Sequence, residues 1–465
     1  MTSYTSTRGA GSPQSFTAAL LSGMAPDGGL YLPEKWPTLD IPALANKSYA
    51  HTALQITRAF IGDDINDDAL EKIIKQTYAP DVFDHQDIAP LVECADNTWL
   101  LELFHGPTLS FKDYALQLLG RLFDHVLKTQ NKRITIVGAT SGDTGSAAIE
   151  ACRHSKNIDI FILHPRGRTS DVQRKQMTTI DTPNVHNIAI EGTFDDCQAL
   201  VKALFADEKF RTNLNPSAVN SINWARIMAQ IIYYVSASTK LGTQENPVSF
   251  TVPTGNFGNV FAAWAARSMA APIGNLTIAS NRNDILTRFF ETGSMIAENV
   301  VPSLSPSMDI QISSNFERYL FELTGRNAQT LTNCMNSFSK NKTFILDDDL
   351  ITRARNDFHA HRCDDAQTLA TMKDFYTETG MLIDPHTAVG VHAARQAGTY
   401  NNDTPSVIVS TAHPAKFPDA VKEATGITPP VPERLAAVLD KPERFDTLPN
   451  SFDKLNDFIY KTIRP

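Results

Sequence analysis

The chain has 465 residues and a formal net charge of −9 at pH 7, with 42% hydrophobic and 20% charged residues. This length predicts two or three domains with a large buried core, and the negative charge argues against a nucleic-acid partner, because phosphate backbones bind basic faces. The longest apolar runs are too short to span a bilayer, and residues 1–9 lack the apolar segment of a secretory signal. We therefore expect a cytoplasmic globular protein with no membrane crossing.

Helical patterns and turns predominate up to about residue 95, and this section contains no phosphate-binding loop. We interpret residues 1–95 as a separate N-terminal domain. Beyond it, short β-rich runs alternate with helical ones, and the predicted strands cover residues 99–104, 134–137, 158–163, 185–190, 248–252, 276–279 and 406–410. This alternation is typical of βαβ units and predicts parallel sheets covered by helices. Ligands of such folds bind at the carboxyl ends of strands.

Lys112 lies between the first of these strands and a predicted helix. Residues 105–108 interrupt the strand, and from Asp113 onwards apolar residues recur at helical spacing. The positive end of the helix dipole disfavours an ammonium group at this place, so a neutral, nucleophilic amine is easier to reach. The position of Lys112 therefore suits Schiff-base chemistry.

Residues 138–145, with the sequence Gly-Ala-Thr-Ser-Gly-Asp-Thr-Gly, follow a predicted strand and open a helix. Three glycines and four hydrogen-bonding side chains could present N–H groups and hydroxyls to a carboxylate or phosphate, which a helix N-terminus favours. A glycine-rich turn that caps the helix explains the same residues without a ligand. The loop alone leaves both interpretations open.

Residues 253–259, Pro-Thr-Gly-Asn-Phe-Gly-Asn, also join a strand to a helix, and Gly255 and Gly258 leave room for a phosphate. Neither this loop nor the previous one matches the dinucleotide pattern GxGxxG, and the pattern GxxxxGK[ST] is absent from the chain. Nicotinamide cofactors and nucleotide hydrolysis therefore lose support. A third turn at the end of a strand, residues 409–417, carries hydroxyl groups. By itself it is weak evidence for a binding site.

Residues 220–226, Asn-Ser-Ile-Asn-Trp-Ala-Arg, precede an apolar helix that continues to Tyr234. The planar fork of Arg226 suits a phosphate. Without a ligand, Asn223 would be a helix cap and Arg226 a surface charge. A phosphorylated substrate would favour phosphate binding by Arg226.

The five cysteines form no CxxC pair, which argues for reduced thiols. His359, His361 and Cys363 lie two residues apart, a spacing that could suggest a metal site. We expect a helix there, on which alternate residues point in different directions, and so we predict no metal site.

Six motifs in order resemble the threonine synthase family, in its shorter bacterial and fungal branch. They are residues 4–9 with 27–31, 104–113, 138–145, 220–226, 253–259 and 411–417. The family uses pyridoxal phosphate to convert O-phospho-L-homoserine and water to L-threonine and phosphate. The resemblance implies an α/β fold of the tryptophan synthase β-like type. In this fold an added N-terminal helical domain is followed by a larger and a smaller parallel-sheet domain, which residues 96–465 would form here. The cofactor lies between these two domains.

The resemblance also implies the role of single residues. Lys112 corresponds to the lysine that forms the internal aldimine. The other cofactor-binding positions that it implies are Asp143 near the ring oxygen, Thr411 beside the pyridine nitrogen, and the phosphate loop Gly255, Asn256, Phe257, Gly258 and Asn259. The substrate-binding positions are Ser141 and Thr144 for the carboxylate and Asn220, Ser221 and Arg226 for the phosphate. A carboxylate at position 143 that faces a phenolate-like oxygen requires a proton or a bridging donor.

Other functions remain open on the same scaffold. A phospho-lyase would release phosphate and form 2-oxobutyrate, and a β-replacing or dehydrating enzyme for serine derivatives would not need Arg226 to bind phosphate. A non-catalytic ligand-binding protein is a further alternative. The expected partner is the small-molecule substrate, and the chain is expected to be a monomer or homodimer. Asp384, in a segment where some relatives have Glu, has no assigned role.

Overall fold

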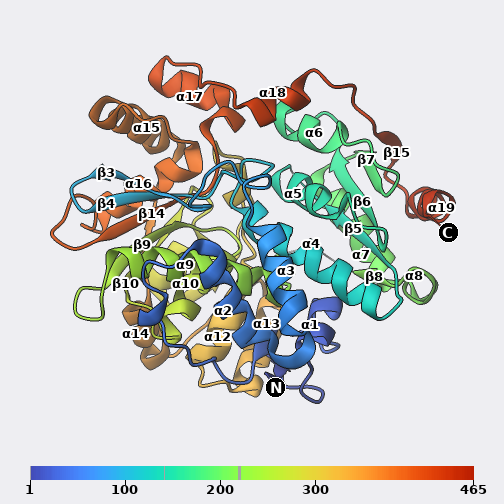
Figure 1. Cartoon of the computed structure of the whole chain (residues 1–465), viewed down its shortest axis with the longest axis horizontal. Helices are drawn as coiled ribbons and strands as arrows, with labels where there is room; N and C mark the ends of the chain where they lie inside the picture. Colours follow the sequence, from blue (N-terminus) through green and yellow to red (C-terminus); the bar gives the residue numbers. More distant parts are fainter. Residues whose placement is uncertain (1, 141, 218–220, 465) are drawn as a thin grey trace.

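The chain forms two large β-sheets, each flanked by helices (Figure 1). The computed structural model describes residues 2–140, 142–217 and 221–464. The larger sheet has six strands in the order β13-β10-β9-β14-β4-β3, and the smaller has five in the order β15-β7-β6-β5-β8. The predicted parallel α/β architecture is confirmed.

The six-stranded sheet is parallel except for the antiparallel pair β3 and β4. Its strands are β3 (Leu91–Ala95), β4 (Thr98–Glu102), β9 (Val248–Pro253), β10 (Ile273–Ser280), β13 (His359–Arg362) and β14 (Ser406–Ser410). In β14, Val407 and Val409 pack into one hydrophobic cluster and Ile408 into another, because successive side chains of a strand point to opposite faces. The flanking helices are α9 (Trp224–Leu241) and α10 (Gly258–Ser268) on the first side, with α15 (Asp365–Thr379), α16 (Pro385–Gln396) and α17 (Pro418–Thr425) on the second.

The five-stranded sheet is parallel throughout. Its strands are β5 (Ile134–Ala139), β6 (Ile158–Pro165), β7 (Val185–Glu191), β8 (Pro216–Ser217) and β15 (Asp446–Pro449). Its helices are α4 (Lys112–Thr129), α5 (Asp143–Cys152) and α6 (Asp171–Thr178) on one face, and α7 (Phe194–Ala206), α8 (Glu208–Leu214) and α19 (Phe452–Thr462) on the other. Strand β6 is buried along its whole length, as expected for a parallel strand covered on both faces.

The first part of the chain contains two short paired strands and three helices, which are β1 (Tyr4–Ser6), α1 (Phe16–Ser22), β2 (Tyr31–Pro33), α2 (Tyr49–Ile61) and α3 (Asp67–Thr77). It packs against α4 and α9, and its apolar side chains belong to the same hydrophobic cluster as theirs. The division at residue 95 stays a prediction. Strand β3, just before that point, pairs with β4 in the six-stranded sheet.

The remaining helices and strands lie outside the two large sheets and their flanking helices. They are α11 (Ile285–Thr292), β11 (Ser294–Ile296), α12 (Phe316–Leu323), α13 (Ala328–Asn341), β12 (Thr343–Ile345), α14 (Asp348–Asp357), α18 (Glu433–Leu439) and the short 3₁₀ helices η1 (Pro42–Leu44), η2 (Gly62–Asp64), η3 (Pro306–Met308) and η4 (Pro414–Lys416). Strands β11 and β12 form a small antiparallel sheet.

The prediction of a helix around His359 is wrong, because β13 occupies these residues and pairs with β10. A free sheet edge offers the chain a row of backbone hydrogen bonds, and this tertiary pairing overrides weak local preference. Alternate residues of a strand share a face, so the reason given against a metal site does not hold. Within the described ranges, no three His, Cys, Asp or Glu side chains are arranged to hold a metal ion.

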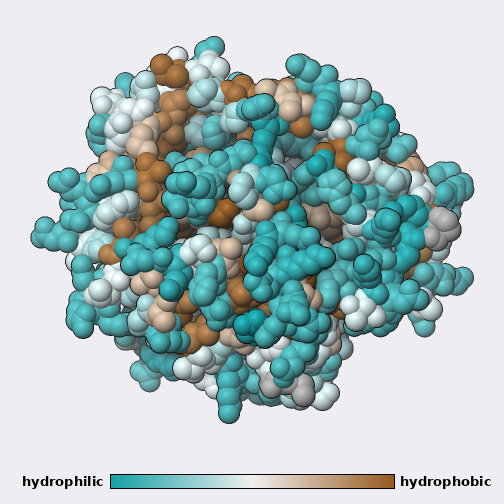
Figure 2. Space-filling view, viewed as in Figure 1, coloured by the Kyte–Doolittle hydropathy of each residue, from teal (hydrophilic) through white to brown (hydrophobic). Residues whose placement is uncertain are grey.

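All five cysteines carry free thiols. Among the described helices, none combines the length and the apolar character that crossing a membrane requires. The face of the molecule seen in Figure 2 is mostly hydrophilic, with hydrophobic side chains in scattered small groups.

Candidate active site

The predicted loops meet in one cavity of about 1370 Å³. Its wall includes residues that follow β5, β9 and β14, so the cavity lies at the carboxyl ends of strands from both sheets. Lys112, Thr144, Ser221, Arg226 and Thr411 all line it. Ser141 and Asn220, also predicted for the site, lie outside the described residues. The structure thus brings together the described site residues that the sequence predicted.

Lys112 is the first residue of α4 and is buried. The turn before it is fixed to the turn after β14, since the Phe111 N–H donates to the Thr411 carbonyl over 2.9 Å and the His413 N–H donates to the Leu109 carbonyl over 3.1 Å. Leu109 adopts a positive φ of 59° in this turn. These contacts place the start of α4 beside the third predicted loop.

Burial lowers the pKa of Lys112, although the nearby Asp143 carboxylate opposes this effect. The positive charges of Lys416 and Arg226 lower the pKa further. The amine lies 3.2 Å from Asp143 Oδ2 and 3.4 Å from Ser307 Oγ. Lys112 therefore loses its proton more easily than an ordinary lysine, as the sequence predicted.

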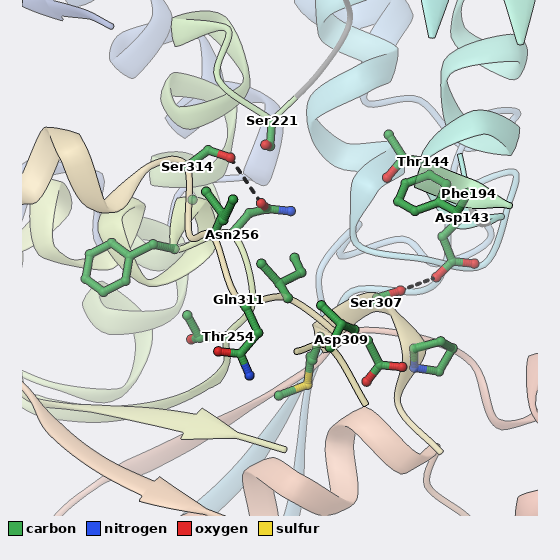
Figure 3. Close-up of a pocket in the computed structure, with 18 of the residues that line it drawn as sticks. Asp143, Thr144, Phe194, Ser221, Thr254, Asn256, Ser307, Asp309, Gln311 and Ser314 are labelled. Atoms are coloured by element: carbon green, nitrogen blue, oxygen red, sulfur yellow. Dashed lines mark hydrogen bonds between the residues drawn. The ribbon is translucent and has the colours of Figure 1, made fainter. Parts of the chain in front are cut away.

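Asp143 is the first residue of α5, and its carboxylate is held by four side chains. Oδ1 accepts from Lys416 Nζ over 2.7 Å and from Gln173 Nε2 over 2.8 Å, and Oδ2 accepts from Ser307 Oγ over 3.2 Å and from Lys112. Figure 3 shows Ser307 pointing toward Asp143. Burial would raise the pKa of Asp143, but the ammonium groups of the two lysines lower it well below the ordinary value.

A glycine is required just before Asp143. Gly142 has a φ of 151°, and a Cβ atom there would lie 2.5 Å from side-chain atoms of Gln173. A larger residue would therefore push Gln173 away from Asp143. Gly142 therefore allows close side-chain packing. Neither interpretation of the 138–145 loop, as an anion-binding loop or as a helix-capping turn, included this role.

The loop of residues 255–259 forms a second wall of the cavity. Helix α10 begins at Gly258 without a side-chain cap, and Phe257 before it is left-handed with a φ of 62°. The first N–H groups of a helix lack partners within it, so those of α10 are available to an anion. A Cβ atom at Gly255 would lie 3.1 Å from the Ser307 carbonyl, so this glycine lets residues 307–310 pass close by.

Asn259 and Asn256 give the loop its polar side chains. The Oδ1 atom of Asn259 accepts hydrogen bonds from the hydroxyls of Tyr233 and, over 2.8 Å, Tyr234. Its Nδ2 atom is buried and has no hydrogen-bond partner among the residues that the structure describes. Asn256 Oδ1 accepts from Ser314 Oγ over 3.3 Å (Figure 3). An unused buried donor at a helix N-terminus fits the phosphate group of pyridoxal phosphate.

Arg226 lies in the first turn of α9, with its side chain buried and facing the same cavity. Burial lowers its pKa to about 10, which still leaves it a cation at neutral pH. The predicted cap is also present, since Asn223 Oδ1 accepts from the Ala225 N–H over 3.1 Å. The two interpretations of this segment were therefore not exclusive, and Arg226 is not a surface charge.

Sequence reasoning missed four polar residues around Asp143. Gln173, Ser307 and Lys416 contact its carboxylate, and His386 contacts Ser307. Lys416 lay within a recognised motif, but lysines are rarely buried. His386 lines the cavity beside the unassigned Asp384, and its Nδ1 lies 2.8 Å from Asp384 Oδ1 while its Nε2 accepts from the Ser307 N–H over 3.3 Å. Asp384 therefore orients the imidazole that fixes the Ser307 turn.

Comparison with known proteins agrees with this geometry. Three family models match the chain, described as threonine synthase N terminus for residues 3–78, pyridoxal-phosphate dependent enzyme for residues 82–336, and threonine synthase, C-terminal, for residues 387–459. A threonine synthase of Pseudomonas aeruginosa is 49% identical, over 98% of this chain and 97% of the relative. The structure of a pyridoxal-phosphate-bound threonine synthase from Brucella melitensis matches with a TM-score of 0.96 and 46% identity over 100% of both chains. The yeast threonine synthase structure matches with a TM-score of 0.93 and 38% identity, over 99% of this chain and 98% of that chain.

Proposed function

Because the chain belongs to the threonine synthase family of pyridoxal-phosphate-dependent enzymes, we propose that it converts O-phospho-L-homoserine and water to L-threonine and phosphate, the last step of threonine biosynthesis. One observation carries this proposal: a single cavity is lined by a buried amine, Lys112, and a buried guanidinium, Arg226. The amine suits covalent catalysis and the guanidinium suits phosphate. A substrate with an amino group and a phosphate at opposite ends matches this pair.

Four parts of the chain would hold the cofactor. Lys112 would bind its aldehyde carbon, and residues 255–259, namely Gly255, Asn256, Phe257, Gly258 and Asn259, would bind its phosphate. Asp143 would lie near its ring oxygen, with Lys416 and Gln173 as the donors that keep the carboxylate compatible with that oxygen. Thr411 would offer a neutral hydroxyl beside the pyridine nitrogen. When bound, pyridoxal phosphate supplies an electron sink for carbanions of the substrate.

The chain's own groups would then bind the substrate and move its protons. Thr144 and Ser141 would bind the substrate carboxylate at the start of α5. Arg226, Ser221 and Asn220 would bind the phosphate until it leaves from Cγ. The Lys112 amine, whose pKa is lowered by burial, would carry protons between Cα and Cβ and leave Cβ ready for water.

Product analysis tests the proposal directly. The holoenzyme is mixed with O-phospho-L-homoserine, and phosphate, threonine and 2-oxobutyrate are measured together. Equal amounts of phosphate and threonine are expected from the wild type, and neither from Lys112→Ala. If 2-oxobutyrate replaces threonine, the chain is a phospho-lyase instead. If no phosphate is released, the substrate assignment is wrong even though the cofactor is bound.

Arg226→Ala tests the phosphate-binding role separately. Loss of a charge-assisted hydrogen bond predicts a rise of about 10-fold or more in the KM for O-phospho-L-homoserine. Arg166→Ala is the matched control, because the Arg166 side chain is 60% exposed and pairs with Glu191 on the surface. An unchanged KM in Arg226→Ala would contradict the role.

We also propose a cytoplasmic location, a monomer or homodimer, and a domain division near residue 95. Free thiols at all five cysteines support a reducing compartment. Light scattering of the purified protein decides the oligomeric state.

A further inference from the structure

Two lysines contact one buried carboxylate in the candidate active site. Lys416 lies in η4, after β14, and is buried. Its Nζ atom lies 2.7 Å from Asp143 Oδ1 and also donates to the Thr108 carbonyl over 2.7 Å. The Lys112 amine lies farther from the same carboxylate, at 3.2 Å from Oδ2. Lys416 therefore forms the closer ion pair with Asp143.

We propose that Lys416 is a positioning residue. It pairs with the negative charge of Asp143 and so leaves Lys112 a neutral amine, ready to react with the aldehyde of pyridoxal phosphate. An isolated buried Lys112–Asp143 pair would hold its proton firmly, because removing that proton would leave one uncompensated negative charge. With Lys416 present, removing the proton from Lys112 leaves the neutral pair Lys416–Asp143. The inference rests on the proposed role of Lys112 and is independent of the substrate.

The charged groups around Lys112 come from three packed elements. They are Asp143 at the start of α5, Lys416 in η4 and Arg226 in the first turn of α9, so that one anion faces two cations. The neutral Ser307 side chain contacts the Lys112 amine, and the neutral Gln173 side chain contacts Asp143. The surroundings of Lys112 thus lower its pKa relative to that of an ordinary lysine.

Three titratable groups, Asp113, His413 and His386, lie behind this cluster. Asp113 accepts from the Thr108 N–H and hydroxyl, and burial raises its pKa to about 6. Burial lowers the pKa of His413 to about 4. His386 is tied to Asp384 through Nδ1 and accepts from the Ser307 N–H through Nε2. A pH profile recorded above pH 7 therefore lies outside the range in which Asp113 and His413 titrate.

Cofactor capture by the apoenzyme measures the state of the Lys112 amine without turnover. The nitrogen bonds to the aldehyde carbon of added pyridoxal phosphate, and the two N–H hydrogens leave with the carbonyl oxygen as water. Only the neutral amine can form this bond, so the capture rate rises with pH through the apparent pKa of Lys112. The absorbance of the bound cofactor gives the rate, and Lys112→Ala gives the background.

Lys416→Met should move the inflection of this profile upward by about one pH unit or more, which is the usual effect of one neighbouring charge. At a fixed pH below the inflection, capture should then be about 10-fold slower. Lys416→Arg should stay close to the wild type because it keeps the positive charge. Lys175→Met is the matched control, since Lys175 donates to a backbone carbonyl on α18 away from Asp143.

A charge-balanced double variant separates this role from simple packing. Asp143→Asn alone should lower the inflection, and Asp143→Asn with Lys416→Met should return it toward the wild-type value. This comparison remains available if Lys416→Met alone does not fold. The proposal is overturned if folded Lys416→Met has the wild-type inflection, or if removing Lys416 from Asp143→Asn leaves the inflection unchanged. Failure of Lys112→Ala to lose capture would instead contradict the proposed role of Lys112.

Discussion

The loop of residues 255–259 and the cluster around Asp143 line the same cavity but are built from different parts of the chain. The loop is one continuous segment, and the groups we propose for binding an anion are the start of α10 and one asparagine. The cluster joins α4, α5, α6, η3 and η4 through side-chain contacts to a single carboxylate. A backbone site depends mainly on local conformation, whereas a charge cluster depends on the whole fold and on pH.

Asp143→Ala should have the largest effect on stability. It leaves two lysine side chains buried without their shared carboxylate, and breaking a buried ion pair costs about 3 kcal/mol or more. Urea unfolding of the apoenzyme measures this loss. Asp171→Ala is the control, because the Asp171 side chain is 83% exposed, and it should change the unfolding free energy by less than about 0.5 kcal/mol. Similar midpoints for the two variants would mean that the cluster does not stabilise the fold.

The stability of the fold should also depend on pH through His413, which lies in the turn that leads to Lys416. Burial lowers the pKa of His413 from 6.5 to about 4. A histidine with a lowered folded pKa contributes stability that is complete above its unfolded pKa and is lost as the pH falls toward the folded value. The loss between pH 6.5 and 4 can approach about 3 kcal/mol.

His413→Asn isolates this effect, because an asparagine can still accept from the Ala415 N–H that His413 Nδ1 now holds. The unfolding free energy is measured between pH 4.5 and about 7. The wild type should lose more stability than the variant over this interval. Parallel curves would show that His413 does not titrate there.

The smallest effect is expected for the tyrosines that support Asn259 in the 255–259 loop. Tyr234→Phe removes one of the two hydroxyls that hold Asn259 Oδ1, a loss of about 1 kcal/mol, so the Kd for pyridoxal phosphate should rise about 5-fold. Tyr4→Phe is the control, since it removes an equally buried hydroxyl, which donates to the Phe60 carbonyl over 2.7 Å outside the cavity. Equal changes in Kd would assign the effect to general stability instead.

The contrast between the two regions also explains what the sequence could predict. Strands β9 and β14 are continuous apolar runs, and both were located from sequence because parallel, doubly covered strands have this pattern. The loops at their ends followed from the glycines and the strand–helix order. The strand at His359 was not predicted, because its pairing with β10 depends on a neighbour far away in the chain.

The side chains of the Asp143 cluster could be predicted only in part. Lys112 and Asp143 open helices inside recognisable motifs, so sequence identified both as candidates. Lys416 and Gln173 read as ordinary polar residues, since only the folded chain shows that they are buried against Asp143. The requirement for a donor at Asp143 was evident from chemistry, but its source was not.

The aromatic packing of Trp224 has a consequence for cooperativity. Trp224 begins α9, and its ring contacts Tyr4 and Phe60, with centroids 6.0 and 5.4 Å away. Arg226 and Tyr233 lie on the same helix, so the first turns of the polypeptide brace the helix that carries them. Heating should therefore melt residues 4–61 together with the candidate active-site cavity in one calorimetric transition.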